Sequence, residues 1–270
     1  MKKLAVSVIC LLALCSHDLY FKTDSYFLNP NQNSELFIFN GTFDKSENSI
    51  SRDRIISSNI VGPDYQFKVQ DSDWYDKDKA THLKFKTGGQ GTYLAGVSTK
   101  PRVIELSAKD FNAYLEHDGV LNVLDDRKKN GKLNDDAREF YAKSAKVLLQ
   151  VGNNKSDDYN TVLGYPVEFI PTSNPYQAKV GDKLSFQLLK EKKPLGGQLV
   201  SFGNRALSAK PSAHGHTHDD AGLKTDKNGM FTIEIDHSGY WYLRTIDMVE
   251  SDDANLEYVS NWATLTFEIK

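Results

Sequence analysis

Cysteine is almost absent from this 270-residue sequence, which holds only Cys10 and Cys15, both near the N-terminus. Residues 16–270 therefore cannot form a disulfide framework, and this part of the chain must be stabilised by packing. The same residues also offer no thiol that could act as a catalytic nucleophile.

Long apolar runs and an excess of basic charge are also missing. After the N-terminal segment no stretch approaches 18 consecutive apolar residues, the length that a transmembrane helix requires. Lys and Arg number 33 against 36 Asp and Glu, so the chain lacks the basic surface that nucleic-acid binding demands. Neither a Gly-x-Ser-x-Gly elbow nor a His-Glu-x-x-His helix occurs. We expect a protein that is not an enzyme and does not bind nucleic acid.

The N-terminus carries the pattern of a secretory signal. Lys2 and Lys3 precede an apolar run that ends at Leu14, and the small residues Cys15 and Ser16 follow. The sequence therefore predicts a signal peptide over residues 1–16 and a periplasmic or otherwise exported protein. Loss of the two lysines changes the formal net charge from −3 to −5.

The cleavage position is open. The small pair Ala13 and Cys15 favours cleavage after Cys15, whereas cleavage after Ser16 would make His17 the first residue. The segment that ends in Cys15 also resembles a bacterial lipobox, although bulky Leu14 stands where a small residue is expected. A lipid anchor on Cys15 is thus a minority alternative.

The first part of the chain, residues 17–163, is expected to form a β domain. Short segments rich in aromatic and β-branched residues alternate with polar turns up to about residue 100. A helical insertion is predicted over about residues 107–151: Ser107 and Asp110 indicate a capping box, and Gly119 a helix end. A second helix is predicted from Asp135 onward, where apolar residues recur at i, i+3 and i+4.

The second part, residues 164–270, shows a regular strand pattern. Leu184, Phe186 and Leu188 alternate with polar residues, and Asn228-Gly229 predicts a hairpin turn. Strands separated by turns about every ten residues are typical of an antiparallel immunoglobulin-like sandwich. The sequence therefore predicts a mainly β protein of two antiparallel β-sandwich domains, with a short helical segment attached to the first.

Three stretches carry a family resemblance. They are "GYPVEFIPTSNPYQAKVGDKLSFQLLKEKKPLGGQLVSF", "LKTDKNGMFTIEIDHSGYWYLRTIDM" and the ending "NWATLTFEI", with "HDLYF" and "FNAYLEHDG" in support. Together they resemble the exported bacterial proteins of domain-of-unknown-function family 4198. That family is related to periplasmic components of nickel and cobalt uptake systems, so the resemblance implies metal handling without catalysis. From the resemblance we expect a histidine beside Met248, and this chain instead has Asp247, whose carboxylate is a harder metal ligand.

The stretch "AHGHTHDD" is the main candidate metal site. In an extended segment His214, His216 and His218 point to the same side, and Asp219 can add a carboxylate. Neutral imidazoles suit nickel, cobalt, copper or zinc. The alternative is a solvated loop between two strands, because residues 208–222 are polar and contain Pro211.

His17 is the second candidate metal ligand. Cleavage after Ser16 would place its α-amine and its imidazole on one residue as a chelating pair. The alternative is an ordinary residue before a β-strand. His82 and His117 are isolated and are interpreted as packing or surface residues, and His237 as part of a turn.

Two functions from different classes follow. The first is an exported metal-binding protein that captures or buffers a transition metal for uptake, with a membrane transporter as a partner. The alternative is a non-catalytic structural or interaction module of the cell envelope. In that case the aromatic residues Tyr240, Trp241, Tyr242 and Trp262 serve packing or partner contact.

Overall fold

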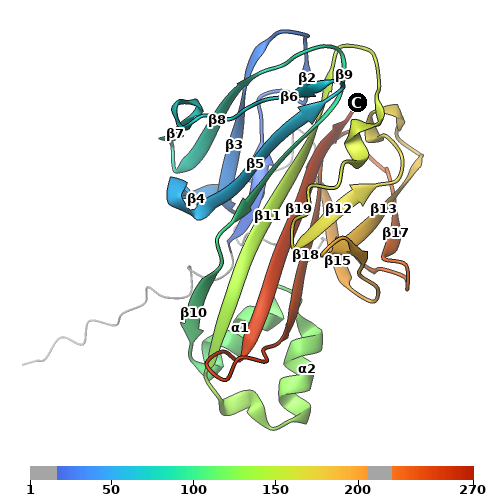
Figure 1. The fold of residues 1–270 in the computed structure, drawn as a ribbon. Helices are drawn as coiled ribbons and strands as arrows, with labels where there is room; N and C mark the ends of the chain where they lie inside the picture. The colour runs from blue at the N-terminus through green and yellow to red at the C-terminus, as the bar shows by residue number, and fades with distance from the viewer. Residues whose placement is uncertain (1–16, 206–220) are drawn as a thin grey trace, which may run out of the picture.

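The computed structural model describes residues 17–205 and 221–270, and a ten-stranded sheet forms its centre (Figure 1). In spatial order the sheet contains β16 (Ala221–Lys224), β15 (Leu199–Arg205), β18 (Gly239–Glu250), β19 (Tyr258–Ile269), β11 (Ala137–Val151), β9 (Gly91–Thr99), β5 (Ile55–Gly62) and β6 (Tyr65–Gln66). The short strands β10 (Arg102–Leu106) and β2 (Phe27–Leu28) also pair with β11.

Two smaller sheets cover opposite faces of the central sheet. One contains β1 (Asp18–Lys22), β3 (Asn33–Gly41), β8 (Ala80–Lys86), β7 (Trp74–Lys77) and β4 (Ser46–Asn48). The other contains β12 (Val167–Pro171), β13 (Lys183–Lys190), β14 (Lys193–Pro194) and β17 (Met230–Glu234). Leu148 packs in the core of the second sandwich, while its neighbours Val147 and Leu149 pack in that of the first. Since successive strand residues point to opposite faces, the two cores lie on opposite sides of β11.

The second half of the chain has immunoglobulin-like topology, as predicted. β12, β13 and β17 form one sheet, and β15, β18 and β19 lie side by side in the other. Leu184, Phe186 and Leu188 all point into the core between them. Gly229 adopts a left-handed φ of 72° in the predicted turn before β17. The mainly β fold with two antiparallel sandwiches is thus confirmed.

The predicted helix from Asp135 to about Gly152 is wrong, because Ala137–Val151 forms the strand β11. From Ala142 onward every residue of β11 is buried, since a core lies on each face of the strand. A strand buried on both faces does not alternate between apolar and polar residues. Its apolar positions therefore matched the helical spacing by coincidence.

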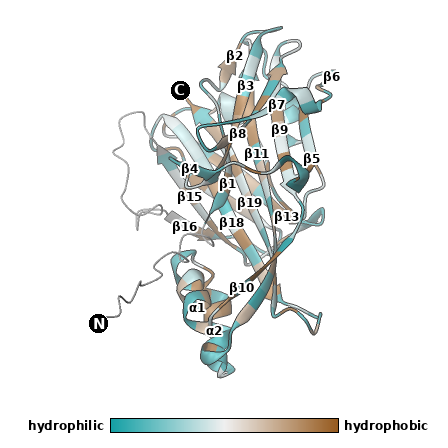
Figure 2. Ribbon diagram, turned by 90° about the vertical axis from the view of Figure 1, so that its left-hand side faces the viewer, coloured by the Kyte–Doolittle hydropathy of each residue, from teal (hydrophilic) through white to brown (hydrophobic). Residues whose placement is uncertain are grey.

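Helices cover one end of the central sheet, beside β10 (Figure 2). The predicted helix after Ser107 is confirmed as α1 (Ala108–His117), with the Ser107 side chain capping Asp110 N. α2 (Leu121–Lys129) follows, and short 3₁₀ turns occupy Arg52–Arg54, Asp71–Asp73, Lys132–Asn134, Asp157–Asn160 and Pro175–Gln177. In residues 17–205 and 221–270, none of the helices has the length and hydropathy to cross a membrane.

Strands from both sides of residue 164 share the central sheet. β11 pairs with β19 in parallel, with Ser144 opposite Ala263. Beyond the sheet, the buried Lys146 ammonium lies 3.0 Å from Glu168, whose carboxylate also accepts the backbone N–H groups of residues 163 and 164. The division of the chain into domains 17–163 and 164–270 stays a prediction.

Substitution of Glu168 tests this buried ion pair. Glu168→Ala leaves the Lys146 ammonium buried without its carboxylate, so we expect the free energy of unfolding to fall by about 3–5 kcal/mol. Urea denaturation measures the change, with exposed Glu234→Ala as the control that stays within about 0.5 kcal/mol. Equal stability of the two variants would contradict this role of the pair.

Candidate functional site

The first described strand is fixed by the last one. β1 pairs with β3 along one edge, with Leu19 opposite Asn40. On its other side, Thr264 Oγ1 donates to the carbonyl of Leu19 at 2.5 Å, and Thr266 Oγ1 to that of Phe21 at 3.1 Å. The segment just after the predicted signal peptide is therefore held by β19.

A buried arginine connects β1 to the helical end of the molecule. Arg244 of β18 places Nε 2.6 Å from Asp18 Oδ2 and Nη2 2.5 Å from Asp118 Oδ1. The hydroxyl of Tyr20 donates to the same Asp18 oxygen at 3.0 Å. All of these residues are buried, and Asp118 caps the end of α1. We call Asp18, Asp118 and Arg244 the arginine clasp.

The arginine clasp is electrostatically strong because it is buried. Burial alone would lower the pKa of Arg244, but the neighbouring carboxylates of Asp18 and Asp118 outweigh this effect and raise its pKa. Removal of one partner would leave an uncompensated charge away from water, which is costly. The clasp therefore holds three separate segments in one arrangement.

Two further buried charged residues of β11, Glu139 and Lys143, lie beside the clasp. Tyr114 donates to Glu139 Oε1 at 3.2 Å, and Ser260 also donates to it. Burial raises the pKa of Glu139 to about 7, although these hydrogen bonds oppose the rise. Burial likewise lowers the pKa of Lys143 to about 8, and its ammonium donates to the carbonyl of His17.

His17 lies at the edge of this charged region. Its Nε2 is 2.9 Å from Glu47 Oε2, and only 8% of the residue is exposed. Burial and the nearby Lys143 charge lower the pKa of His17, while Glu47 acts in the opposite direction. The ring is therefore neutral at neutral pH. With Nε2 donating to Glu47, Nδ1 carries the lone pair that a metal would use.

The other predicted ligands are not tested by the structure. His214, His216, His218 and Asp219 lie outside the described residues. The strands on either side of them, β15 and β16, pair with Phe202 opposite Ala221.

The remaining histidines have local partners. His82 packs between Phe37 and Tyr75, and its Nδ1 lies 3.2 Å from Glu35. His237 lies 3.0 Å from Asp236 in the predicted turn, and His117 lies 3.8 Å from Asp118.

Metal ligands do not cluster in the described part of the chain. No group of three His, Cys, Asp or Glu side chains there is arranged to hold an ion. Asp247, at the position where the family resemblance led us to expect a histidine, pairs with Lys190 at 2.7 Å. The described residues alone therefore do not supply a complete metal centre.

Sequence reasoning missed the arginine clasp and the buried charges of Glu139 and Lys143. The sequence did contain one signal of a buried ion pair. Arg244 interrupts the otherwise mostly apolar stretch from Tyr240 to Ile246 in a predicted strand. A charge in such a run has to be paired when the strand is buried. The identity of its partners, which lie 226 and 126 residues away, could not be read from the sequence.

The fold and the buried charges define a class of two-sandwich β protein with an immunoglobulin-like C-terminal half. The family model for a domain of unknown function, DUF4198, matches residues 14–248. The chain belongs to this family, which confirms the resemblance seen in the sequence. None of the curated proteins matches the chain.

The solved structures that match this chain are distant in sequence. The D0-D1 domain of intimin is 12% identical at a TM-score of 0.20, and the match covers 92% of this chain and 96% of the intimin chain in that structure. The trypsin-activated alpha-2-macroglobulin from Escherichia coli is 9% identical at a TM-score of 0.24, with 94% of this chain and 16% of that one covered. A marsupial T cell receptor is 8% identical at a TM-score of 0.21, and the match covers 94% of this chain and 74% of the receptor chain. At these TM-scores the similarities carry no information about function.

The raised pKa of Glu139 predicts a pH-dependent stability. The pKa of this carboxyl is about 7 in the folded protein and 4.5 in the unfolded chain, so the folded state binds the proton more tightly. Its stabilising contribution is complete below pH 4.5 and is lost as the pH rises to 7. Between these pH values we expect the unfolding free energy of the native protein to fall by about 3 kcal/mol relative to that of Glu139→Gln. Urea unfolding at stepped pH measures the difference, with exposed Glu105→Gln as the control, and parallel curves for native protein and Glu139→Gln would refute it.

Proposed function

We propose that this is an exported, non-catalytic protein that captures or buffers a transition-metal ion near the cell envelope for uptake. The ion is nickel, cobalt, copper or zinc, and a membrane transporter is the receiving partner. The observation that carries the proposal is the orientation of His17, whose Nε2 lies 2.9 Å from Glu47 Oε2, so that Nδ1 carries the ring's lone pair.

The Glu47–His17 contact is the arrangement that metal-binding histidines favour. Such a histidine commonly donates its second ring N–H to a carboxylate, which fixes the ring and makes the other nitrogen a better ligand. The lowered pKa of His17 keeps the imidazole in the neutral form that binds metals. Signal cleavage after Ser16 would then place the free α-amine beside Nδ1, and the two would chelate one ion.

The charges around His17 restrict which ions fit. The Lys143 ammonium disfavours a cation, whereas Glu47 and Asp18 favour one. Nitrogen ligands and the near balance of charge suit a borderline transition metal better than magnesium or calcium, which require several oxygen ligands. His214, His216, His218 and Asp219 form a second set of candidate ligands, between β15 and β16, for the same class of ion.

Metal titration of the processed protein tests the proposal. We expect heat on adding nickel, cobalt, copper or zinc in calorimetry, and loss of the His17 component in His17→Ala. Glu47→Gln removes only the carboxylate that orients the ring, so affinity at this site should fall about 10- to 100-fold. A variant with alanine at 214, 216 and 218 measures the contribution of the second set.

The outcomes separate the two sets of ligands. Mass spectrometry of the mature protein must find His17 as the first residue, and a chain that begins at Ser16 would remove the amine from the site. Equal heats for the native protein and the triple variant would exclude the histidine run. Absence of heat for the native protein with all four ions would end the metal proposal.

The alternative, an interaction module of the envelope, is supported by an exposed row of apolar side chains. Val103, Phe140, Val259 and Val249 lie opposite one another on β10, β11, β19 and β18. Val103 is 52% exposed and Val249 is 45% exposed. The helices pack on the other face, through the neighbouring residues of these strands. Contiguous apolar surface of this kind marks contact sites in soluble proteins.

Site-specific photo-crosslinking tests the interaction module. A photoreactive residue at position 249 should give an adduct in cells, and the adduct should disappear when Val103→Asp places a charge in the same row. Position 180, occupied by a valine that is 49% exposed elsewhere on the surface, is the matched control. An equal yield from positions 180 and 249, or an adduct that survives Val103→Asp, would contradict a specific contact.

A further inference from the structure

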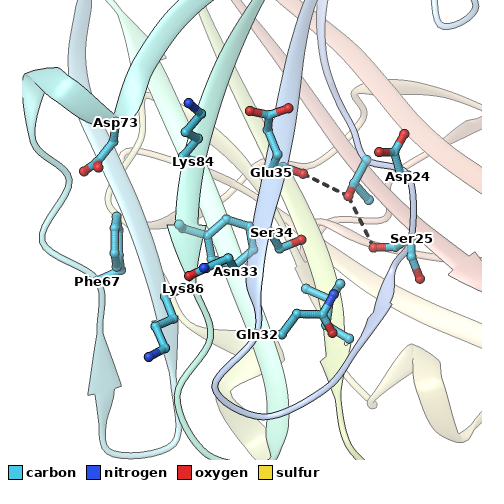
Figure 3. Close-up of a pocket in the computed structure, with 13 residues that line it drawn as sticks. Asp24, Ser25, Gln32, Asn33, Ser34, Glu35, Phe67, Asp73, Lys84 and Lys86 are labelled. Carbon is cyan, nitrogen blue, oxygen red and sulfur yellow. Dashed lines mark hydrogen bonds between the residues drawn. The ribbon is translucent and has the colours of Figure 1, made fainter.

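We propose that a polar groove on the first sandwich binds an acidic oligosaccharide. The groove lies beside β3 and β8 and has a volume of about 690 Å³, within the range of small-ligand sites (Figure 3). Charged, amide and hydroxyl side chains line it together with an aromatic ring. None of these residues belongs to the proposed metal site.

Two lysines supply positive charge on one side of the groove. Lys84 and Lys86 occupy alternate positions of β8, opposite Glu35 and Asn33 of β3, and so project from the same face of the sheet. Neither lysine forms an ion pair with a carboxylate in the described part of the chain, although the Lys84 ammonium lies 4.7 Å from the ring centre of Tyr75. Alternate strand positions are about 7 Å apart, so each lysine can meet a carboxylate on a different sugar unit.

Neutral polar groups lie beside the lysines. Gln32 Oε1 accepts the backbone N–H of Asn29 at 2.8 Å, which orients the amide and leaves its NH₂ group as a donor. Asn33 is exposed on the groove, and Ser34 follows it. Amides both donate and accept hydrogen bonds, as sugar hydroxyls also do, so these side chains match the uncharged part of an oligosaccharide.

Phe67 provides an apolar contact within this polar lining. Its ring is partly buried and meets Phe85 edge-on at 6.5 Å, so its position is fixed by the core. Figure 3 places Phe67 near Lys86, with Asp73 on the same side of the groove. An aromatic ring between charged groups suits the C–H face of a sugar ring, which is apolar while its edges are polar.

Carboxylates in the groove argue against a polyphosphate ligand. Asp24, Glu35 and Asp73 all line it, and they would repel a nucleic acid or another closely spaced polyanion. Glu35 is also held by His82 Nδ1 at 3.2 Å, so its place is fixed. An acidic oligosaccharide carries fewer charges among many hydroxyl groups. Its carboxylates can pair with the two lysines, while its hydroxyls donate hydrogen bonds to the carboxylates of the groove.

Calorimetric titration with soluble acidic oligosaccharides tests the proposal. The probes are tri-galacturonic acid, a hyaluronan tetrasaccharide and the disaccharide of N-acetylglucosamine and N-acetylmuramic acid, with maltotriose as the neutral comparison. We expect at least one acidic probe to bind and maltotriose not to bind. Lys84→Ala and Lys86→Ala should each weaken binding about tenfold, and exposed Lys193→Ala should leave it unchanged.

Every titration contains EDTA, so a failure here is distinguishable from a failure of the metal proposal. Binding that Lys193→Ala weakens as much as Lys84→Ala would show general charge attraction and overturn the site. Competition by acetate or inorganic phosphate at the same concentration would reduce it to a simple anion site. Absence of binding by all three acidic probes would overturn the proposal as well.

Discussion

The parallel pairing of β11 with β19 is the interaction on which the rest of the molecule depends. It joins strands from the two halves of the chain into one sheet, and a core packed on each side of that sheet buries both faces of β11. The two cores, the helical end and the arginine clasp are all built on strands of that sheet. Parallel strands need a long connection, and residues 152–257 provide it between β11 and β19.

Much of the fold could be predicted from sequence because local patterns report local structure. The Ser107 cap and the alternation at Leu184 and Phe186 correctly predicted a helix and a strand, since a single exposed face was enough to set the period. The same reasoning failed at β11. A segment with no exposed face has no period of its own, and its conformation is decided by partners such as Ala263 that lie far along the chain.

The candidate site also has a part that the sequence could predict and a part that it could not. His17 was identified from its position after the signal pattern, but the Glu47 partner that orients its ring comes from β4. The charges of Asp18, Asp118 and Arg244 were visible in the sequence, whereas their meeting in a buried cluster was not. Ion pairs between distant residues do not follow a fixed spacing in the sequence, because only the tertiary fold brings the partners together.

The contact between β1 and β19 has a consequence for how the chain folds. Thr264 and Leu19 are separated by 245 positions, so this contact cannot form until nearly all of the polypeptide has been synthesised. Pairings of such high sequence separation carry a large loop-closure cost and slow the folding reaction. The contact between the first and last strands is therefore expected among the late events of folding.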